Sequence, residues 1–220
     1  MSEAQDYVIW GSAGHAKVLV EAIALLGGKV CAFFDNRSVD AVIEGAPIFL
    51  GEDGFEEWLN LHGELNDVAG ATAIGGPFGR DRLDIQDRFH RYGISTPAIV
   101  HPEAVVSPTS YVGSGSQVLA FANIAADSQV GRACIVNHNA SVDHECNLGD
   151  GVHIAPGATI CGSVSVGDNV FIGAGAILLP RVSIGEDAII GAGAVVTKNV
   201  PSGVTVVGNP AAPIKSGSRY

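Results

Sequence analysis

The chain has little charge and few aromatic side chains. Asp, Glu, Lys and Arg make up 16% of its 220 residues, and Phe, Trp and Tyr make up 6%. Acidic residues outnumber basic ones by 23 to 12, for a formal net charge of −11, and the basic residues form no run. Nucleic-acid-binding proteins need clustered basic side chains that neutralise phosphates. We therefore expect no nucleic-acid partner.

Long apolar runs and closely spaced cysteines are also missing. No apolar segment reaches the roughly 20 residues of a membrane span without a Gly or a charge, so we expect no membrane insertion. The start, MSEAQDYVIW, lacks the basic region and the long apolar core of a signal peptide. The four cysteines form no Cys-x-x-Cys pair and fit buried, reduced thiols: Cys31, Cys134, Cys146 and Cys161. Together these features predict a cytoplasmic protein.

What the sequence does have is a branched aliphatic side chain at every sixth position over residues 100–196. The series has no gap: Val100, Val106, Val112, Val118, Ile124, Val130, Val136, Val142, Leu148, Ile154, Ile160, Val166, Ile172, Leu178, Ile184, Ile190 and Val196. A period of six matches neither a helix nor an alternating strand. It fits a short strand and a tight corner, repeated, with three units closing one triangular coil around the aliphatic side chains. Gly and Asn residues after many of these positions suit corners that need a positive φ or a close backbone approach.

This run resembles the left-handed parallel β-helix of the hexapeptide-repeat acyltransferases. The left-handed sense comes with the resemblance, because parallel crossovers are otherwise right-handed. After Val196 the repeat is lost, and the turn Gly208-Asn209-Pro210-Ala211 resembles the end of many coenzyme A-dependent members. We expect residues 99–220 to form the β-helix and a C-terminal cap.

Residues 1–98 have a different pattern, typical of a Rossmann-like βαβαβ domain. A buried strand over residues 7–10 ends at Gly11-Ser12-Ala13-Gly14-His15, and a helix over 16–26 and a strand over 29–34 follow. A helix over 52–61, a strand over 68–74 and an amphipathic helix over 81–92 complete the prediction. The glycine turn points the N–H groups of a helix start at whatever binds above the sheet. It is G-x-x-G rather than G-x-G-x-x-G, so a dinucleotide site is a poor match.

The glycine turn, read as G-x-x-G-H-x-K ahead of hexapeptide repeats, resembles the PglD/NeuD type of sugar acetyltransferase. That family modifies nucleotide-linked amino sugars, or sialic acid, in bacterial surface glycan pathways; its N-terminal domain holds the nucleotide sugar, and acetyl-CoA lies along the β-helix. The resemblance implies a substrate site of Ser12, Ala13, Gly14, His15, Asp35, Asn36, Arg37 and Gly75. Asp35 ends the second strand, where such folds bind a ribose or sugar hydroxyl. The family often has a second acid and a lysine in place of Asn36 and Arg37.

The polar corner segment over residues 137–146 contains the candidate catalytic base. His144 matches the family's catalytic histidine, and an imidazole can take the proton that an amine sheds when it attacks a thioester. The resemblance makes Glu145 its supporting carboxylate. Neighbouring strand residues point to opposite faces, so Glu145 reaches the ring only if the corner bends the chain, and Asp143 is the alternative. Asn137 is predicted to orient the ring or the substrate.

The resemblance also implies a binding site for the co-substrate acetyl-CoA, which would run past His153, Gly162, Ala174 and Ala192. His153 follows His144 by nine residues, half of an eighteen-residue coil, so the two side chains should leave opposite sides of one coil. If both serve one reaction, they come from different subunits. The flat faces of a three-sided column then favour a homotrimer.

No metal is expected. His138 and His144 are one hexad apart and so belong to different faces, while Cys146 occupies a core-facing position. These three side chains therefore do not form a zinc site.

The sequence thus predicts an acetyl-CoA-dependent N-acetyltransferase that acts on a nucleotide-linked amino sugar, first of all a UDP-linked 4-amino-4,6-dideoxy sugar. His144 would be the general base for direct attack, and a backbone N–H near Gly162 would meet the oxyanion. Three alternatives stay open. They are O-acetylation of a sialic acid or other sugar hydroxyl, N-acetylation of a GDP-linked amino sugar, and a non-catalytic β-helix that only binds.

Overall fold

The buried aliphatic runs of the N-terminal part form one parallel sheet in a computed structural model, which describes residues 5–39, 43, 45–63, 65 and 67–214. Strands β1 (Asp6–Trp10), β2 (Lys29–Asp35), β3 (Ile48–Leu50) and β4 (Val68–Thr72) lie in the order β3-β2-β1-β4. The helices are α1 (Gly14–Leu25), α2 (Gly51–His62) and α3 (Gly79–Arg91). Strand β3 was not predicted, because its three half-buried or exposed residues show no alternation.

The strand order reverses between β1 and β4, since β2 follows β1 on one side and β4 pairs with it on the other. Open α/β sheets bind ligands at such a reversal, outside the carboxyl ends of the strands. The glycine turn that follows β1 lies at this edge.

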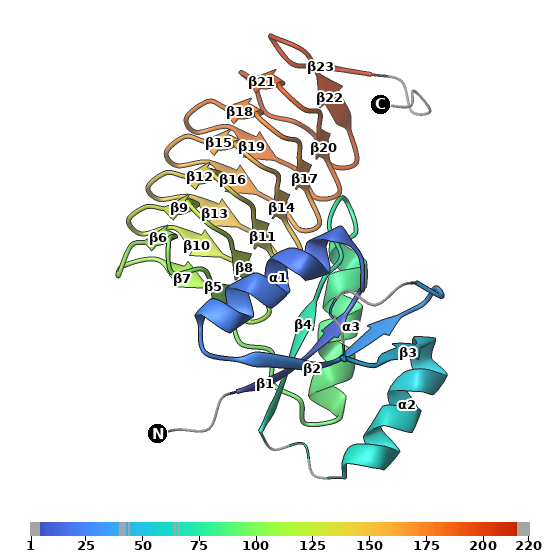
Figure 1. Ribbon diagram of the computed structural model, residues 1–220. Coiled ribbons are helices and arrows are strands. Elements are labelled where there is room, and N and C mark those ends of the chain that lie inside the picture. The colour runs from blue at the N-terminus through green and yellow to red at the C-terminus, as the bar shows by residue number, and fades with distance from the viewer. Residues whose placement is uncertain (1–4, 40–42, 44, 64, 66, 215–220) are drawn as a thin grey trace.

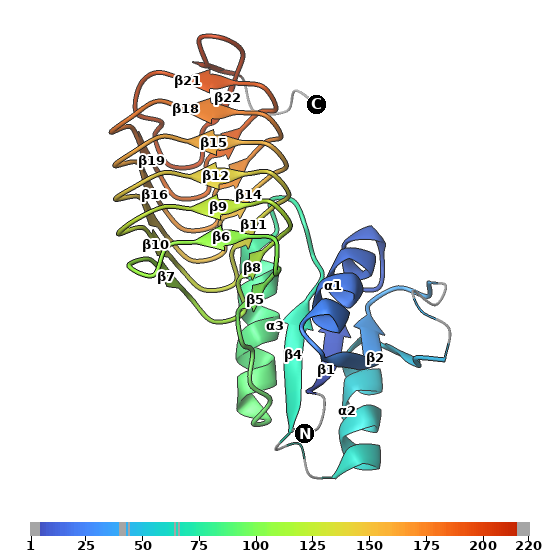
Figure 2. The same ribbon diagram turned by 60° about the vertical axis from the view of Figure 1, so that its left-hand side comes forward.

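The second part is a parallel β-helix of three sheets, which rises from the first domain (Figures 1 and 2). One sheet contains β5 (Ile99–Val100), β8 (Gln117–Val118), β11 (Ile135–Val136), β14 (His153–Ile154), β17 (Phe171–Ile172), β20 (Ile189–Ile190), β22 (Thr205–Val207) and the antiparallel β23 (Ala212–Pro213). The next contains β6 (Val105–Val106), β9 (Asn123–Ile124), β12 (Ser141–Val142), β15 (Thr159–Ile160), β18 (Ile177–Leu178) and β21 (Val195–Val196). The third contains β7 (Tyr111–Val112), β10 (Gln129–Val130), β13 (Asn147–Leu148), β16 (Ser165–Val166) and β19 (Ser183–Ile184). The domain boundary at residue 98 stays a prediction.

The aliphatic series lines the axis of the β-helix, as its period predicted. The members from Val118 onward are buried in a single core, and the three of the first coil, Val100, Val106 and Val112, pack partly buried against it. Partners stack eighteen residues apart, as in Val136 above Val118 and Ile154 above Val136. Eighteen residues therefore make one coil.

The corners need glycine at one position and a left-handed conformation two residues later, where glycines such as Gly151 and non-glycine residues both occur. A Cβ on Gly131 would lie 2.5 Å from the carbonyl oxygen of Gly149, so this glycine is needed for close approach. Positive φ falls two residues later, at Ala133, Asn139 and Glu145 among others. This left-handed conformation, which an L residue rarely adopts, turns the chain sharply at each such corner.

Arg82 of α3 joins the two domains. Its side chain is 0% exposed, and its guanidinium donates to backbone carbonyls rather than to a carboxylate. Nε donates to Ala133 (2.8 Å) and Nη2 to Gly151 (2.7 Å) in the β-helix, while Nη1 donates to Ile74 (3.1 Å) after β4. Burial lowers the pKa of Arg82 to about 10, so the group stays charged at neutral pH. Among the described residues, no helix is both long and apolar enough to span a bilayer.

We expect Arg82→Met to lower the free energy of unfolding by about 3 kcal/mol, because each buried carbonyl left without a donor costs about 1–3 kcal/mol. Arg91→Met, at the exposed end of the same helix, should change it by less than about 0.5 kcal/mol. Denaturant titration followed by circular dichroism measures both. Equal losses in the two variants would contradict this role of Arg82.

Candidate functional site

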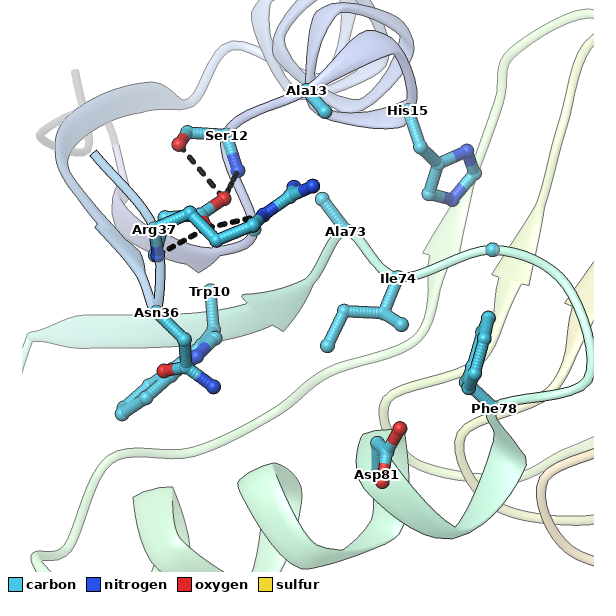
Figure 3. A pocket seen from close by; sticks show the side chains of 13 residues that line it. Trp10, Ser12, Ala13, His15, Asn36, Arg37, Ala73, Ile74, Phe78 and Asp81 are labelled. Carbon is cyan, nitrogen blue, oxygen red and sulfur yellow. Dashed lines mark hydrogen bonds and ion pairs between the residues drawn. The ribbon is translucent and has the colours of Figure 1, made fainter. Parts of the chain in front are cut away.

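A cavity of about 550 Å³ opens at the carboxyl ends of β1, β2 and β4 (Figure 3). This volume is typical of small-molecule sites. Of the predicted substrate residues, the cavity is lined by Ser12, Ala13, His15, Asp35, Asn36, Arg37 and Gly75. Gly14 is exposed at the start of α1 and does not line it. The sequence did not single out the other lining residues, which are Trp10, Gly11, Ala73, Ile74, Phe78 and Asp81.

Asp35 forms hydrogen bonds with two other residues of the cavity wall. Its Oδ2 accepts hydrogen bonds from the N–H (2.9 Å) and hydroxyl (3.0 Å) of Ser12, and its Oδ1 accepts one from the N–H of Arg37 (3.0 Å). Burial alone would raise the pKa of Asp35, but these donors outweigh it and lower the pKa. The carboxylate is 5% exposed and already bonded. It therefore holds the glycine turn in shape, and its contact with a sugar hydroxyl stays a prediction.

His144 and Glu145 meet at the corner between β12 and β13. The ring Nδ1 lies 3.0 Å from Glu145 Oε2, while Asp143 Oδ1 accepts the backbone N–H of His144 at 2.8 Å. The bend needed for this contact is present, because Glu145 has a φ of +57°. A carboxylate can only accept, so Nδ1 carries the hydrogen and Nε2 keeps a lone pair. The histidine side chain is 55% exposed, which leaves Nε2 able to take a proton from a ligand.

Gly162 lies one coil above His144. A Cβ built on Gly162 would lie 2.5 Å from His144 Nε2, so any larger residue there would force the ring to move. Among the described residues, the backbone N–H of Gly162 has no hydrogen-bond acceptor. The corner therefore places a free N–H beside the candidate base.

Asn137 and His153 lie away from His144, on the β11 side of the coil. The Asn137 side-chain oxygen accepts the backbone N–H of His138 (2.8 Å), and its nitrogen lies 3.3 Å from His153 Nε2. Asn137 thus does not orient the His144 ring within one chain, because the two belong to different corners. Ala174 and Ala192 are exposed on the corners that follow β17 and β20, in the same sheet as β14.

His153 is buried where the two domains meet. The side chain is 6% exposed, and its Nδ1 accepts the backbone N–H of Gly76 at 2.8 Å. Burial, with the charge of Arg82 second, lowers the pKa of His153 to about 3, so the ring is neutral. Its role as a cofactor contact stays a prediction.

A single chain therefore divides the predicted residues into two groups. One group lies on the side of the β-helix that carries β11 and β14, and it comprises the cavity, Asn137 and His153. The other group is the corner formed by His144, Glu145 and Gly162. Within the described ranges, no three His, Cys, Asp or Glu side chains are grouped so as to hold a metal ion.

Comparisons with known proteins match both halves of the chain. Residues 6–84 match the PglD N-terminal domain, and residues 163–198 match the bacterial transferase hexapeptide (six repeats). The acetyltransferase domain of PglB from Neisseria gonorrhoeae FA1090, solved with acetyl coenzyme A, is 34% identical over 96% of this chain and 100% of that one, with a TM-score of 0.86. PerB from Caulobacter crescentus, solved with CoA and GDP-perosamine, is 37% identical over 96% and 97%, with a TM-score of 0.85.

A curated relative, GDP-perosamine N-acetyltransferase of Escherichia coli O157:H7, is 43% identical over 83 residues, so the match spans 38% of that relative's length. These similarities confirm the predicted fold class, an N-terminal α/β domain followed by a left-handed parallel β-helix.

The buried His153 should make the free energy of unfolding decrease as the pH is lowered below about 6.5. An unfolded histidine has a pKa of about 6.5, so between about pH 6.5 and pH 3 the unfolded state binds the extra proton. This one group then contributes a slope of up to about 1.4 kcal/mol per pH unit. His153→Asn keeps an acceptor for Gly76 but does not titrate, so its slope should be shallower.

Urea titrations at several pH values measure these slopes. The unaltered chain, measured in parallel, is the reference for the slope. An unchanged slope in His153→Asn would contradict a neutral buried ring.

Proposed function

The chain belongs to the family of PglD- and PerB-type hexapeptide-repeat acetyltransferases, and we propose that it transfers an acetyl group from acetyl-CoA to the amino group of a nucleotide-linked sugar. The observation that carries this proposal is the corner where Glu145 holds His144 with Nε2 free beside the N–H of Gly162. Relatives named as N-acetyltransferases support an amine acceptor over the hydroxyl of a sialic acid.

In this proposal the cavity of the first domain holds the nucleotide part. The N–H groups at the start of α1 and the guanidinium of Arg37 supply positive charge for the phosphates. The substrate was predicted to be UDP-linked; the relatives named for GDP-perosamine favour the alternative, a GDP-linked amino sugar, and both are candidates. The cytoplasmic location stays a prediction.

The chemical step is direct attack of the amine on the thioester carbonyl carbon. The nitrogen forms a bond to that carbon and gives up a proton to His144 Nε2, while Glu145 stabilises the imidazolium. The N–H of Gly162 donates to the carbonyl oxygen as it becomes negative. Collapse of the tetrahedral intermediate expels the thiolate of CoA, which takes a proton and leaves as the thiol.

A homotrimer is part of the proposal. His144 and the cavity belong to different sides of one coil, so a neighbouring copy has to bring its His144 corner to the cavity. The same arrangement would let one acetyl-CoA touch Gly162 of one copy and Ala174 and Ala192 of another.

We expect a thermal-shift screen of UDP-, GDP- and CMP-linked amino sugars, with and without acetyl-CoA, to give one pair that raises Tm most. With that pair, His144→Ala should lower kcat by about 10²–10⁴-fold, the usual contribution of a general base. His101→Ala, in the first coil, is the control. No stabilisation by any nucleotide sugar or by acetyl-CoA would contradict the proposal.

Gly162→Ala should lower kcat by about 100-fold, because the new Cβ would push the ring out of position and an error of about 1 Å costs that much. In the His144→Ala background there is no ring to displace, so the same substitution should add little. A full further loss in the double variant would mean that the added Cβ does not lower kcat by displacing the His144 ring.

A further inference from the structure

Gln117, the first residue of β8, links the β-helix to the first domain through a buried amide. Its side chain is 1% exposed. Nε2 donates to the backbone carbonyl of Thr72, at the end of β4, over 2.6 Å, and Oε1 lies 2.7 Å from Nε2 of His15 in α1. A backbone carbonyl can only accept, so the contact with Thr72 fixes which end of the amide is the NH₂ group. The amide oxygen therefore faces His15.

This arrangement determines the tautomer of His15. The amide oxygen can only accept, so His15 Nε2 must carry a hydrogen. A neutral imidazole has a single N–H, which leaves Nδ1 with its lone pair. Among the described residues, Nδ1 of His15 has no hydrogen-bond partner. His15 is one of the residues that line the cavity (Figure 3), and Nδ1 is the ring atom left without a partner.

The surroundings of His15 keep the ring neutral. Burial lowers the pKa of His15 most, the bond to Gln117 raises it, and the nearby Arg82 and His138 lower it again. His153 of β14 is the other titratable group coupled to His15, and it is neutral. No carboxylate is among the groups in the described chain that act on this ring. An imidazolium at the start of α1 would suit a phosphate, but a neutral ring with a lone pair repels phosphate oxygens.

We propose that Gln117 is a positioning residue that holds His15 as the Nε2-protonated tautomer, so that Nδ1 accepts a hydrogen bond from the sugar. The first candidate for the donor is the amino group that becomes acetylated. This step rests on the proposed function, because it takes the ligand of the cavity to be a nucleotide-linked amino sugar. It assigns His15 to the sugar and leaves the phosphates to Arg37 and the N–H groups of α1.

The tautomer can be measured without any ligand. Long-range ¹H–¹⁵N correlation spectra of the ¹⁵N-histidine-labelled chain, with His15 assigned by His15→Asn, should show Nε2–H and a bare Nδ1 from neutral to alkaline pH. Gln117→Met should give a mixture of tautomers. Gln117→Glu should favour the doubly protonated ring, since a carboxylate stabilises it. A wild-type ring protonated on Nδ1 would overturn the proposal, even if no Gln117 variant folds.

Gln129→Met is the matched control. Gln129 occupies the same position of the hexad in β10, on another face, and is exposed. Its substitution should leave the His15 spectrum unchanged. Equal spectral changes in the Gln117 and Gln129 variants would also overturn the proposal.

Kinetics show whether the tautomer matters to the substrate. Gln117→Glu should raise KM for the amino sugar about tenfold, the value of one hydrogen bond, with KM for acetyl-CoA unchanged. The acid limb of its kcat/KM profile should move to higher pH, because His15 then has to lose a proton to accept. An unchanged KM and profile would overturn the assignment of His15 to the sugar. If the spectra are as expected but no acetyl transfer occurs, the proposed function fails and the control of His15 by Gln117 stands.

Discussion

Each coil of the β-helix takes eighteen residues, and this period fixes where every functional side chain can lie. Aliphatic side chains at every sixth position fill the axis, so the residues between them have fixed places on one of three faces or corners. His144 stays on the corner after β12 and His153 in the sheet of β14, whatever else the sequence does. A single chain then cannot bring its own His144 to its own cavity without breaking the stack. The chemistry proposed here follows from this separation.

Buried polar contacts set how the first domain sits on the β-helix. Arg82, Gln117 and His153 each bond to backbone groups across the junction, at Gly151, Thr72 and Gly76 respectively. Such contacts are directional, and leaving them unmade is costly, so they fix a geometry that apolar packing alone would leave looser. Asp35 does the same for the glycine turn inside the cavity. The polar residues of the site thus divide into those that hold its shape and those left free for a ligand.

Most of the architecture could be predicted from the sequence, because a strict period of six is compatible with few folds besides a three-sided β-helix. The three-residue β3 was missed, since nothing in so short a segment alternates. Glu145 was predicted to support His144 on condition that the corner bends, and its positive φ supplies the bend. The contact of Asp35 with a hydroxyl stays a prediction, whereas its bonds to Ser12 were not foreseen because that partner lies 23 residues away. Gln117 gave no signal, because its partners are 45 and 102 residues distant and an outward glutamine on a solenoid is typical of a solvent-facing residue.

If one copy's cavity works with a neighbour's His144, two inactive variants should complement each other when they are mixed. One variant is His144→Ala, and the other is Ala13→Trp, which fills the cavity from an exposed position on its wall. If the site is shared, refolding or co-expressing the two together restores acetyl transfer at about a quarter of the sites, the random-mixing value for a cyclic assembly. A mixture no more active than its two components would contradict a site shared between copies.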